Sequence, residues 1–444
     1  MTSKRTLSVF VSLLLPAGIV VAAATQSGDA TNSGQGAALP RTDANGNPLR
    51  RAPTKHVSNY DEAKVGAYTL PDPLVLQNGQ PVRTPEQWFK QRRAEIIRLY
   101  ENEIYGRVPE RAPRLTFRVA QTETNALEGT AVRKQVVGRL GDSPDGPEVN
   151  VWLYLPAKAK RPAPVLLYLS FFGTDPGKPP SHGLTRNGRP QFNTSGPLTN
   201  ALARGYGYAT VCYTEFEGDS ATNSITLARK MALAPGQTKP APDEWGTISV
   251  WAWGVSRVLD YLQTDPAVDA RRVALIGHSR LGKTALWAGA QDPRFAMVFS
   301  SCAGEMGSSL ARRNYGETID DMVANLSWQF AENFRKYSGH WNDMPVDAHM
   351  LIALNAPHPV FITAGTEDQW ADPRGEFLAT VAAGPVYRLL GERDLGETEG
   401  PPVDKPLITG ALGFLYHTGP HAITAADWEA FYDFAQQLER GVKP

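Results

Sequence analysis

The stretch that decides the fold is RRVALIGHSRLGKTALWAGAQDP, residues 271–293. Its first part is an apolar run that stops at Gly277, and a helix-forming run follows Ser279. The stretch therefore predicts a strand, a tight turn and a helix, with Ser279 in the turn. Many hydrolases present a nucleophilic serine on such a turn, although a serine that caps the helix is common at the same place. The usual second glycine is missing, because Leu281 stands in its position.

Apolar strand-like runs and helical patterns alternate on both sides of this stretch. Such alternation predicts an α/β fold with a mostly parallel central sheet and helices on both faces, a three-layer αβα sandwich of the α/β-hydrolase type. In these sheets the active residues lie on loops at the carboxyl ends of the strands. The runs predict strands at 148–157, 163–173, 205–215, 271–279, 295–304 and 358–368, and helices at 84–110, 243–266, 281–293, 371–384 and 422–441.

The amino-terminal residues predict export. Lys4 and Arg5 precede an apolar run that ends in three alanines at 22–24, which is the pattern of a secretory signal peptide over residues 1–24. An uncleaved membrane anchor is the alternative interpretation. Residues 25–57 are polar and rich in Gly, Asn and Pro, so we expect a disordered leader before a single catalytic domain at 58–444. The mature protein is then periplasmic or secreted, and free of the membrane.

Composition excludes several partner classes. The chain has 45 basic and 45 acidic residues, and this balance predicts neither nucleic-acid binding nor attachment to a membrane surface. The two cysteines, Cys212 and Cys302, cannot form a disulfide framework. Two buried free thiols are the favoured interpretation, and a single bridge remains the alternative. We expect a monomer.

A nucleophilic serine needs a base and an acid, which follow it in the order acid and then histidine in this type of fold. Asp368 follows the apolar part of the predicted strand, His358–Ala364, where a triad acid is expected, whereas Asp372 precedes Pro373 and fits a helix cap. His421 lies on a Gly-Pro turn before the last helix, the position of a general base. His417 lies inside an apolar run and is expected to be packed.

Glu305, on the loop after strand 295–304, is a possible auxiliary acid, although it can equally contact substrate or cap a helix. His349 and His358 flank an apolar helix and are interpreted as structural. No pair of histidines has the helical spacing of metal ligands with a carboxylate nearby, so we expect neither a metal nor an organic cofactor.

Four stretches carry a resemblance to a known family: GHSRLGKTALWA, RRNYGET, GTEDQWADPRGEF and GPHAITAADWEAFYDF. Together they resemble the glucuronoyl esterases, carbohydrate esterase family 15, and the similarity extends over residues 58–440. The Gly-[Cys/His]-Ser-Arg-x-Gly-Lys element of that family accounts for the missing glycine. These enzymes cleave the ester between a 4-O-methyl-glucuronic acid branch of xylan and a lignin alcohol.

The resemblance implies a role for each matching residue. Ser279 becomes the nucleophile, His421 the base and Arg280 a donor to the oxyanion, while Lys283 contacts sugar hydroxyls. Glu317 and Trp370 match positions that line the uronate pocket. Without the resemblance, Arg280 and Lys283 could be a cation pair on an exposed helix face, but two cations in a first turn oppose the helix dipole.

The sequence departs from the fungal members of the family at two positions. His278 stands where those members have a disulfide-bonded cysteine, and Cys302 stands where their acid falls. The acid role is therefore assigned to Asp368, as in many bacterial members. Two other functions remain open: a different serine hydrolase, such as an acetyl xylan esterase or a peptidase, and a non-catalytic, secreted carbohydrate-binding protein on the same scaffold.

Overall fold

The computed structural model describes residues 40–178, 185–186, 189–190, 196–221 and 225–441. The predicted signal peptide and the first part of the predicted leader lie outside the described residues. Residues from Pro40 onward form one compact unit. No helix in the described part of the chain has both the length and the apolarity to cross a bilayer.

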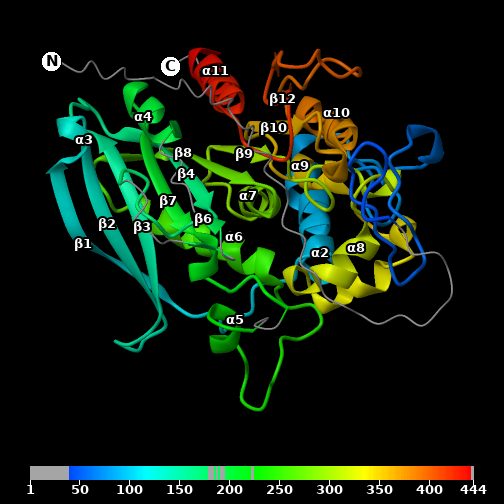
Figure 1. Cartoon of the computed structure of the whole chain (residues 1–444), viewed down its shortest axis with the longest axis horizontal. Helices are drawn as coiled ribbons and strands as arrows, with labels where there is room; N and C mark the ends of the chain where they lie inside the picture. Colours follow the sequence, from blue (N-terminus) through cyan, green and yellow to red (C-terminus); the bar gives the residue numbers. More distant parts are fainter. Residues whose placement is uncertain (1–39, 179–184, 187–188, 191–195, 222–224, 442–444) are drawn as a thin grey trace, which may run out of the picture. The chain divides into compact units, whose positions relative to one another are not determined.

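A ten-stranded sheet runs through this unit in the order β1-β2-β3-β7-β4-β8-β9-β10-β12-β11 (Figure 1). Neighbours from β7 to β12 in this order are parallel, whereas β1, β2, β3 and β11 are joined by antiparallel pairs. The predicted, mostly parallel α/β sheet is confirmed. The strands are β1 (Leu115–Asn125), β2 (Ala131–Leu140), β3 (Glu148–Pro156), β4 (Ala163–Ser170), β7 (Gly207–Cys212), β8 (Val268–His278), β9 (Met297–Ser301), β10 (Val360–Gly365), β11 (Leu407–Ile408) and β12 (Leu412–His417).

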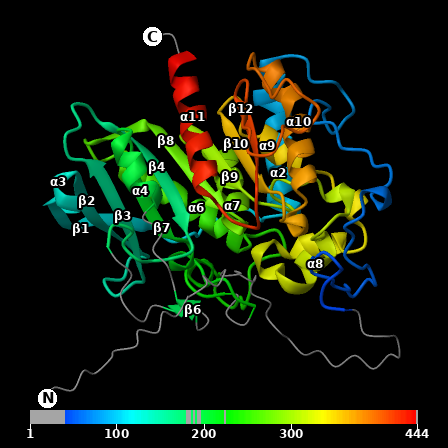
Figure 2. The ribbon, with the colours of Figure 1, turned by 45° about the horizontal axis from the view of Figure 1, so that its top comes forward.

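Helices cover both faces of the sheet, as Figure 2 shows. Along β9 and β10, alternate side chains enter opposite cores: Phe299 and Phe361 belong to one hydrophobic cluster, Val298 and Ile362 to the other. Because both faces are buried, these strands are continuously apolar in sequence. The first cluster is closed by α4 (Gly196–Ala203) and α11 (Ala425–Gly441), and the second by α2 (Arg93–Glu103), α6 (Thr247–Leu262), α7 (Arg280–Gln291), α9 (Ala348–Ala353) and α10 (Pro373–Leu389).

Three parts of the chain differ from the sequence expectation. The strands β1 and β2 were not predicted, because β1 is polar and largely exposed and lacks the apolar run of a central strand. The predicted helix 84–110 ends at Glu103 and includes a π-helical turn over Trp88–Arg92. Residues 40–57, expected to be disordered, form turns held by long-range contacts, such as the hydrogen bond from the Tyr60 hydroxyl to the Pro48 carbonyl.

The turn between β8 and α7 is as tight as its sequence predicts. Ser279 has φ 59° and ψ −130°, a left-handed conformation that non-glycine residues seldom adopt. The turn brings the helix against the strand so closely that a Cβ on Gly277 would lie 2.0 Å from the Leu281 carbonyl oxygen. A Cβ on Gly282 would lie 2.8 Å from the Ser300 hydroxyl of β9. Both glycines are therefore required by packing.

We expect Gly277→Ala to lower the free energy of unfolding by about 1–3 kcal/mol, because the added methyl must push α7 away from β8. Thermal unfolding of the purified variant measures the loss. Gly391→Ala is the comparison for backbone strain alone: an added Cβ there meets nothing within 4 Å, but the φ of 87° disfavours any side chain, so a smaller loss is expected. A melting temperature equal to that of the wild-type protein would contradict this account of the turn.

Candidate active site

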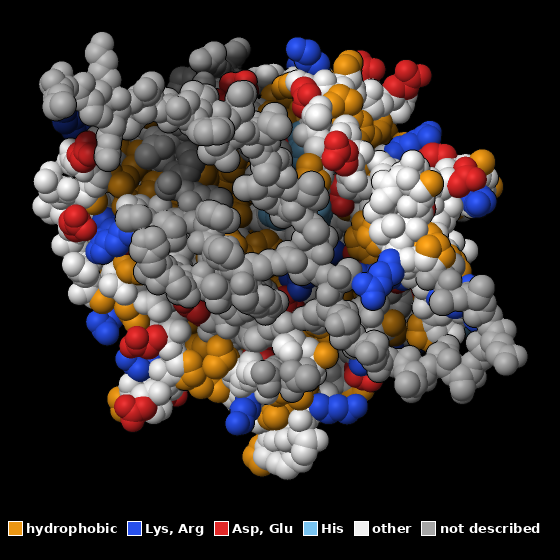
Figure 3. All heavy atoms as spheres, in the orientation of Figure 1, with side chains coloured by type: hydrophobic (Ala, Val, Ile, Leu, Met, Phe, Trp, Pro, Cys, Tyr) orange, Lys and Arg blue, Asp and Glu red, His pale blue; other side chains and the backbone are white. Residues whose placement is uncertain are grey.

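Three of the predicted site residues lie at the carboxyl ends of parallel strands. Ser279 follows β8, Asp368 follows β10, and His421 follows β12, which pairs directly with β10. Figure 1 shows the ends of these strands gathered at one edge of the sheet. On the face seen in Figure 3, histidine side chains are visible near the middle, between hydrophobic surfaces.

His421 and Asp368 are hydrogen-bonded. The Nδ1 atom of His421 lies 2.5 Å from Oδ2 of Asp368, and the two side chains are 40% and 5% exposed. A buried carboxylate that binds one ring nitrogen fixes the orientation of the imidazole and leaves Nε2 for proton transfer. Gly365 allows the close approach of this loop, because a Cβ there would lie 2.6 Å from the Pro420 carbonyl oxygen.

His278 immediately precedes Ser279, and its ring packs against the ring of His421. Its ring centroid lies 4.6 Å from that of His421, and its Nδ1 lies 3.3 Å from the Ser301 hydroxyl. Burial, and then the neighbouring imidazoles of His421 and His417, lower the pKa of His278 well below its usual value. His278 is therefore an uncharged side chain that packs against His421.

His417 is packed, as predicted. Its Nδ1 lies 2.9 Å from Asp427, and its Nε2 lies 3.2 Å from the Pro420 carbonyl oxygen, so it braces the turn that carries His421. Burial alone would lower the pKa of His417, but the hydrogen bond with Asp427 raises it above the usual value. Asp372 caps α10 by accepting the Gly375 N–H at 3.0 Å, which confirms its structural role.

Cys302 directly follows β9 and lies beside Asp368 and His421. One ligand atom each from Cys302, Asp368 and His421 lie within 4.8 Å of one another. Burial raises the pKa of the Cys302 thiol well above its usual value, so this side chain is a neutral neighbour of the pair. Cys302 and Cys212 are both buried and are not joined in a disulfide, as the sequence analysis favoured.

Arg280 is held by an acid that the sequence analysis missed. Its guanidinium donates to Asp219, whose side chain is 2% exposed. Asp219 also accepts from the Tyr213 hydroxyl at 2.9 Å, and from two side chains of a distant turn, the Trp328 Nε1 at 2.9 Å and the Gln329 amide at 3.1 Å. The only sequence signal was the position of Asp219 a few residues beyond the end of β7.

These contacts keep Asp219 ionised. Burial alone would raise its pKa, but the Arg280 charge and the three other hydrogen bonds lower it below the usual value. Burial likewise opposes the charge on Arg280, and the attraction of Asp219 outweighs it and raises the pKa of Arg280. Arg280 is therefore a fixed cation next to Ser279 rather than a mobile surface side chain.

Lys283, Glu317 and Trp370 are the candidate sugar-contacting residues. Lys283 is buried, and its ammonium makes no hydrogen bond or ion pair with any other residue that the structure describes. Burial lowers the pKa of Lys283, while the charge of Glu317 opposes this shift. The Glu317 N–H donates to the Trp370 carbonyl at 2.8 Å, which joins the loops of these two residues. Arg50 lies 4.7 Å above the centroid of the Trp370 ring.

Glu305 belongs to this neighbourhood rather than to the pair of His421 and Asp368. No hydrogen bond between Glu305 and His421 occurs among the described residues, and Oε1 of Glu305 is buried without a partner. Burial raises the pKa of Glu305 well above its usual value; Asp347 and Glu317 add to the shift and Lys283 opposes it. These contacts therefore do not support the role of Glu305 as an auxiliary acid beside His421.

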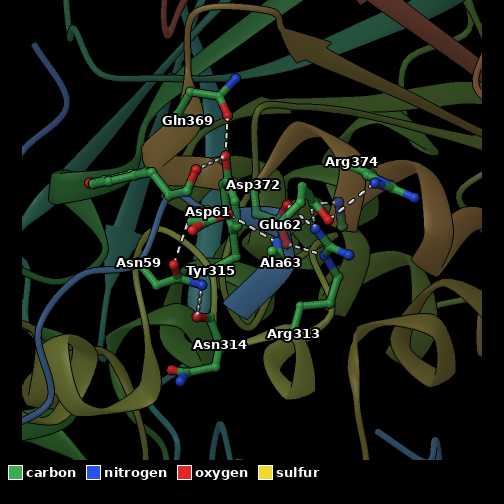
Figure 4. A network of polar contacts seen from close by, with 12 residues as sticks. Asn59, Asp61, Glu62, Ala63, Arg313, Asn314, Tyr315, Gln369, Asp372 and Arg374 are labelled. Atoms are coloured by element: carbon green, nitrogen blue, oxygen red, sulfur yellow. Dashed lines mark hydrogen bonds and ion pairs between the residues drawn. The ribbon is translucent and has the colours of Figure 1, made fainter. Parts of the chain in front are cut away.

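An ionic network anchors the loops behind the site (Figure 4). Arg313 binds Asp372 with Nε at 2.8 Å from Oδ2, and its Nη2 lies 2.5 Å from the Glu62 carboxylate. The Tyr315 hydroxyl donates to Gln369 at 2.6 Å. Because Gln369 stands between Asp368 and Trp370, the network ties the acid loop to the segment that leads into Glu317.

Glu376 joins α10 to the loop after β9. Its Oε1 accepts the Gly304 N–H at 2.9 Å and the Ser308 hydroxyl at 2.5 Å. Burial raises the pKa of Glu376 to about 8. An acid with a raised pKa in the folded state binds a proton that the unfolded chain releases, so its contribution to stability falls as pH rises from the unfolded pKa toward the folded one.

We therefore expect Glu376→Gln, which stays neutral, to change the pH dependence of unfolding. The melting temperature of the variant relative to wild type should rise between pH 5 and about 8, since only the wild-type protein must bury a charge as pH increases. Thermal scans at several pH values measure this difference. Glu399→Gln, at an exposed position, is the control. A difference that is independent of pH would contradict the assigned shift.

The contacts of Asp219 predict a kinetic effect for Asp219→Asn. If Arg280 is the oxyanion donor that the family resemblance implies, loss of the charge that holds it should lower kcat by up to about 10²–10³, with a smaller change in KM. The reaction is followed with an ester of glucuronic acid. Asp265→Asn is the matched control, because Asp265 is a buried partner of Lys134 at 2.6 Å near the start of β8. If both variants lose stability equally and retain kcat, Asp219 is only structural.

Comparison with known proteins places this geometry in context. The family profile described as glucuronyl esterase, fungi, matches residues 240–391. Carbohydrate esterase MZ0003, from an unknown prokaryotic organism, is 40% identical over 86% of this chain and 92% of its own length. A glucuronoyl esterase structure from Solibacter usitatus is 43% identical with a TM-score of 0.79, over 84% of this chain and 99% of its own. A CE15 glucuronoyl esterase from Teredinibacter turnerae T7901 is 35% identical with a TM-score of 0.77, over 86% and 92%.

Proposed function

This chain belongs to the glucuronoyl esterases of carbohydrate esterase family 15, and we propose that Ser279, His421 and Asp368 are its catalytic triad. The proposed reaction is hydrolysis of the ester between a 4-O-methyl-glucuronic acid branch of glucuronoxylan and a lignin alcohol. The observation that carries the proposal is the 2.5 Å contact between His421 and a buried Asp368, at the same end of the parallel strands as the strained turn of Ser279.

The proposed mechanism has two stages. His421 takes the proton of the Ser279 hydroxyl as its oxygen attacks the ester carbonyl, and Asp368 stabilises the imidazolium that forms. The tetrahedral intermediate collapses when His421 donates that proton to the leaving alcohol, and a glucuronoyl-serine ester remains. Water, deprotonated by His421, then attacks this ester and releases the free carboxylate and Ser279.

Arg280 is proposed to stabilise the oxyanion. Its N–H lies at the start of α7, where the helix dipole favours negative charge, and its guanidinium is fixed by Asp219. A donor that is fixed before the reaction needs no reorganisation when charge develops on the carbonyl oxygen. The ion pair with Asp219 therefore explains why a flexible arginine can serve this role.

Lys283, Glu317 and Trp370 are proposed to bind the uronate sugar. The ammonium of Lys283 has donors to spare, since no described residue accepts from it, and sugar hydroxyls are suitable acceptors. Glu317 can accept from hydroxyl groups, and the ring of Trp370, with Arg50 above it, supplies an apolar surface. Export through the predicted signal peptide and action as a monomer complete the proposal.

We expect Ser279→Ala to lower kcat on benzyl glucuronate by at least about 10³-fold, because no other nucleophile replaces the hydroxyl. Initial rates on benzyl glucuronate, its galacturonate epimer and p-nitrophenyl acetate test the sugar and the ester together. Ser143→Ala, at an exposed serine, is the control. Fast acetate turnover without uronate-ester cleavage would contradict the substrate, and an active Ser279→Ala variant would contradict the nucleophile.

A further inference from the structure

A concavity lies at the end of the sheet where the parallel strands begin, opposite to the end that carries Ser279. It has a volume of about 990 Å³ and is bounded by the β3–β4 connection, the start of β4, the end of α4, the start of β8 and Gln436 of α11. The acidic residue that lines it is Asp269, and we call the concavity the basic groove. Its cationic lining residues are Lys158, Lys160, Arg161, Arg204, Arg271 and Arg272.

The basic groove is separate from the active site. Strand β8 borders the groove over Val268–Arg272 and leads to Ser279 at its other end. At about 3.3 Å per residue, this strand places the two sites roughly 30 Å apart. Figure 2 shows α4 and α11 beside β8, on the face of the sheet that they cover. None of the residues assigned to catalysis or sugar binding lines the groove.

The positive charge of the groove is only partly compensated. Lys158, Lys160 and Arg161 are exposed, and none of them has a hydrogen bond or ion pair with another described residue. Arg204 binds Glu429, and Arg271 lies 3.4 Å from Asp269. Since the whole chain has equal numbers of acidic and basic residues, this concentration of cations is local. A concave surface of one sign focuses the field and attracts ligands of the other sign.

The dimensions and chemistry of the groove favour an extended anion with several charges. Its volume is at the upper end of the range for ligand pockets, and is far more than one inorganic ion needs. Tyr206, the aromatic side chain that lines it, is only 6% exposed and offers little surface for stacking. Recognition therefore depends on charge, and carboxylates on a flexible chain can reach cations on both walls.

We propose that the basic groove binds an acidic polysaccharide, through ion pairs between its uronate carboxylates and the lysines and arginines of the groove. This inference rests on the proposed function, because ester hydrolysis leaves a free glucuronate carboxylate on the xylan chain. Branches that are already unesterified are anions of the same kind. The groove then holds the enzyme on the polymer while Ser279 acts on an ester elsewhere on it.

The test compares polymer affinity for groove and control variants. Lys158→Glu, Lys160→Glu and Arg161→Glu are combined in a Ser279→Ala background, so that the polymer stays unchanged during titration. Affinity for glucuronoxylan at low salt should fall by about ten-fold or more, and the wild-type groove should lose its affinity as salt is added. The control combines Arg83→Glu, Lys90→Glu and Arg118→Glu, three exposed cations outside the groove with the same change in net charge.

Further measurements separate the possible results. Neutral arabinoxylan should bind weakly to every variant, and equal binding of neutral and acidic xylan would overturn the proposal. Tighter binding of a sulfated polymer than of any uronate polymer would also overturn it. With Ser279 intact, the groove variant should hydrolyse benzyl glucuronate as fast as wild type. Failure of wild-type hydrolysis would refute the proposed function, whereas unchanged polymer affinity of the groove variant would refute only the groove.

Discussion

The close contact between β8 and α7 is the constraint on which the site depends. The chain reverses direction at Ser279 with a positive φ, and the Ser279 N–H donates to the Ser301 carbonyl at 2.8 Å. This bond fixes the turn against the end of β9, so Cys302 and the loop beyond it are placed by the same contact. Gly277 makes the arrangement possible, because no side chain fits between the strand and the Leu281 carbonyl. One steric requirement therefore sets the position of the proposed nucleophile and of its neighbours.

The pKa values of the buried carboxylates near this turn depend on the hydrogen-bond donors that surround each carboxylate. Asp219 accepts from four side chains, two on each oxygen, and its pKa is lowered despite burial. Glu376 has two donors, both on one oxygen, and its pKa rises to about 8. Glu305 has a buried oxygen with no partner, and burial raises its pKa well above the usual value. The number and charge of the donors, not the residue type, decide which acids carry charge here.

Sequence reasoning located Ser279, Asp368 and His421 because the end of a parallel strand is a local property. An apolar run followed by a loop identifies such an end, and the α/β order of elements brings the ends together. Asp219 could not be found in this way. Its partners Arg280 and Trp328 are 61 and 109 residues away in the chain, and no periodicity or spacing relates them.

The segment 40–57 also depends on long-range contacts that the sequence does not reveal, and here they order residues that were expected to be disordered. Its composition is typical of a disordered leader, since it offers few apolar residues to bury. Its order comes from contacts that composition does not encode: Pro48 accepts from Tyr60, and Arg50 covers the ring of Trp370. The polar strand β1 is a similar case, because it pairs with β2 along most of its length without a buried face of its own.

The proximity of Cys302 to Asp368 is consistent with the proposed placement of the triad acid on the loop after β10. Resemblance to the fungal members places their acid at the end of β9, where this chain has Cys302. The ligand atoms of Cys302, Asp368 and His421 lie within 4.8 Å of one another, so a carboxylate at both strand ends would bring two like charges to one imidazole. Like charges at that separation disfavour ionisation of both acids. A buried thiol with a raised pKa fills the place without charge, and the carboxylate of Asp368 is hydrogen-bonded to His421. The change at position 302 and the acid at position 368 are thus two parts of one electrostatic arrangement.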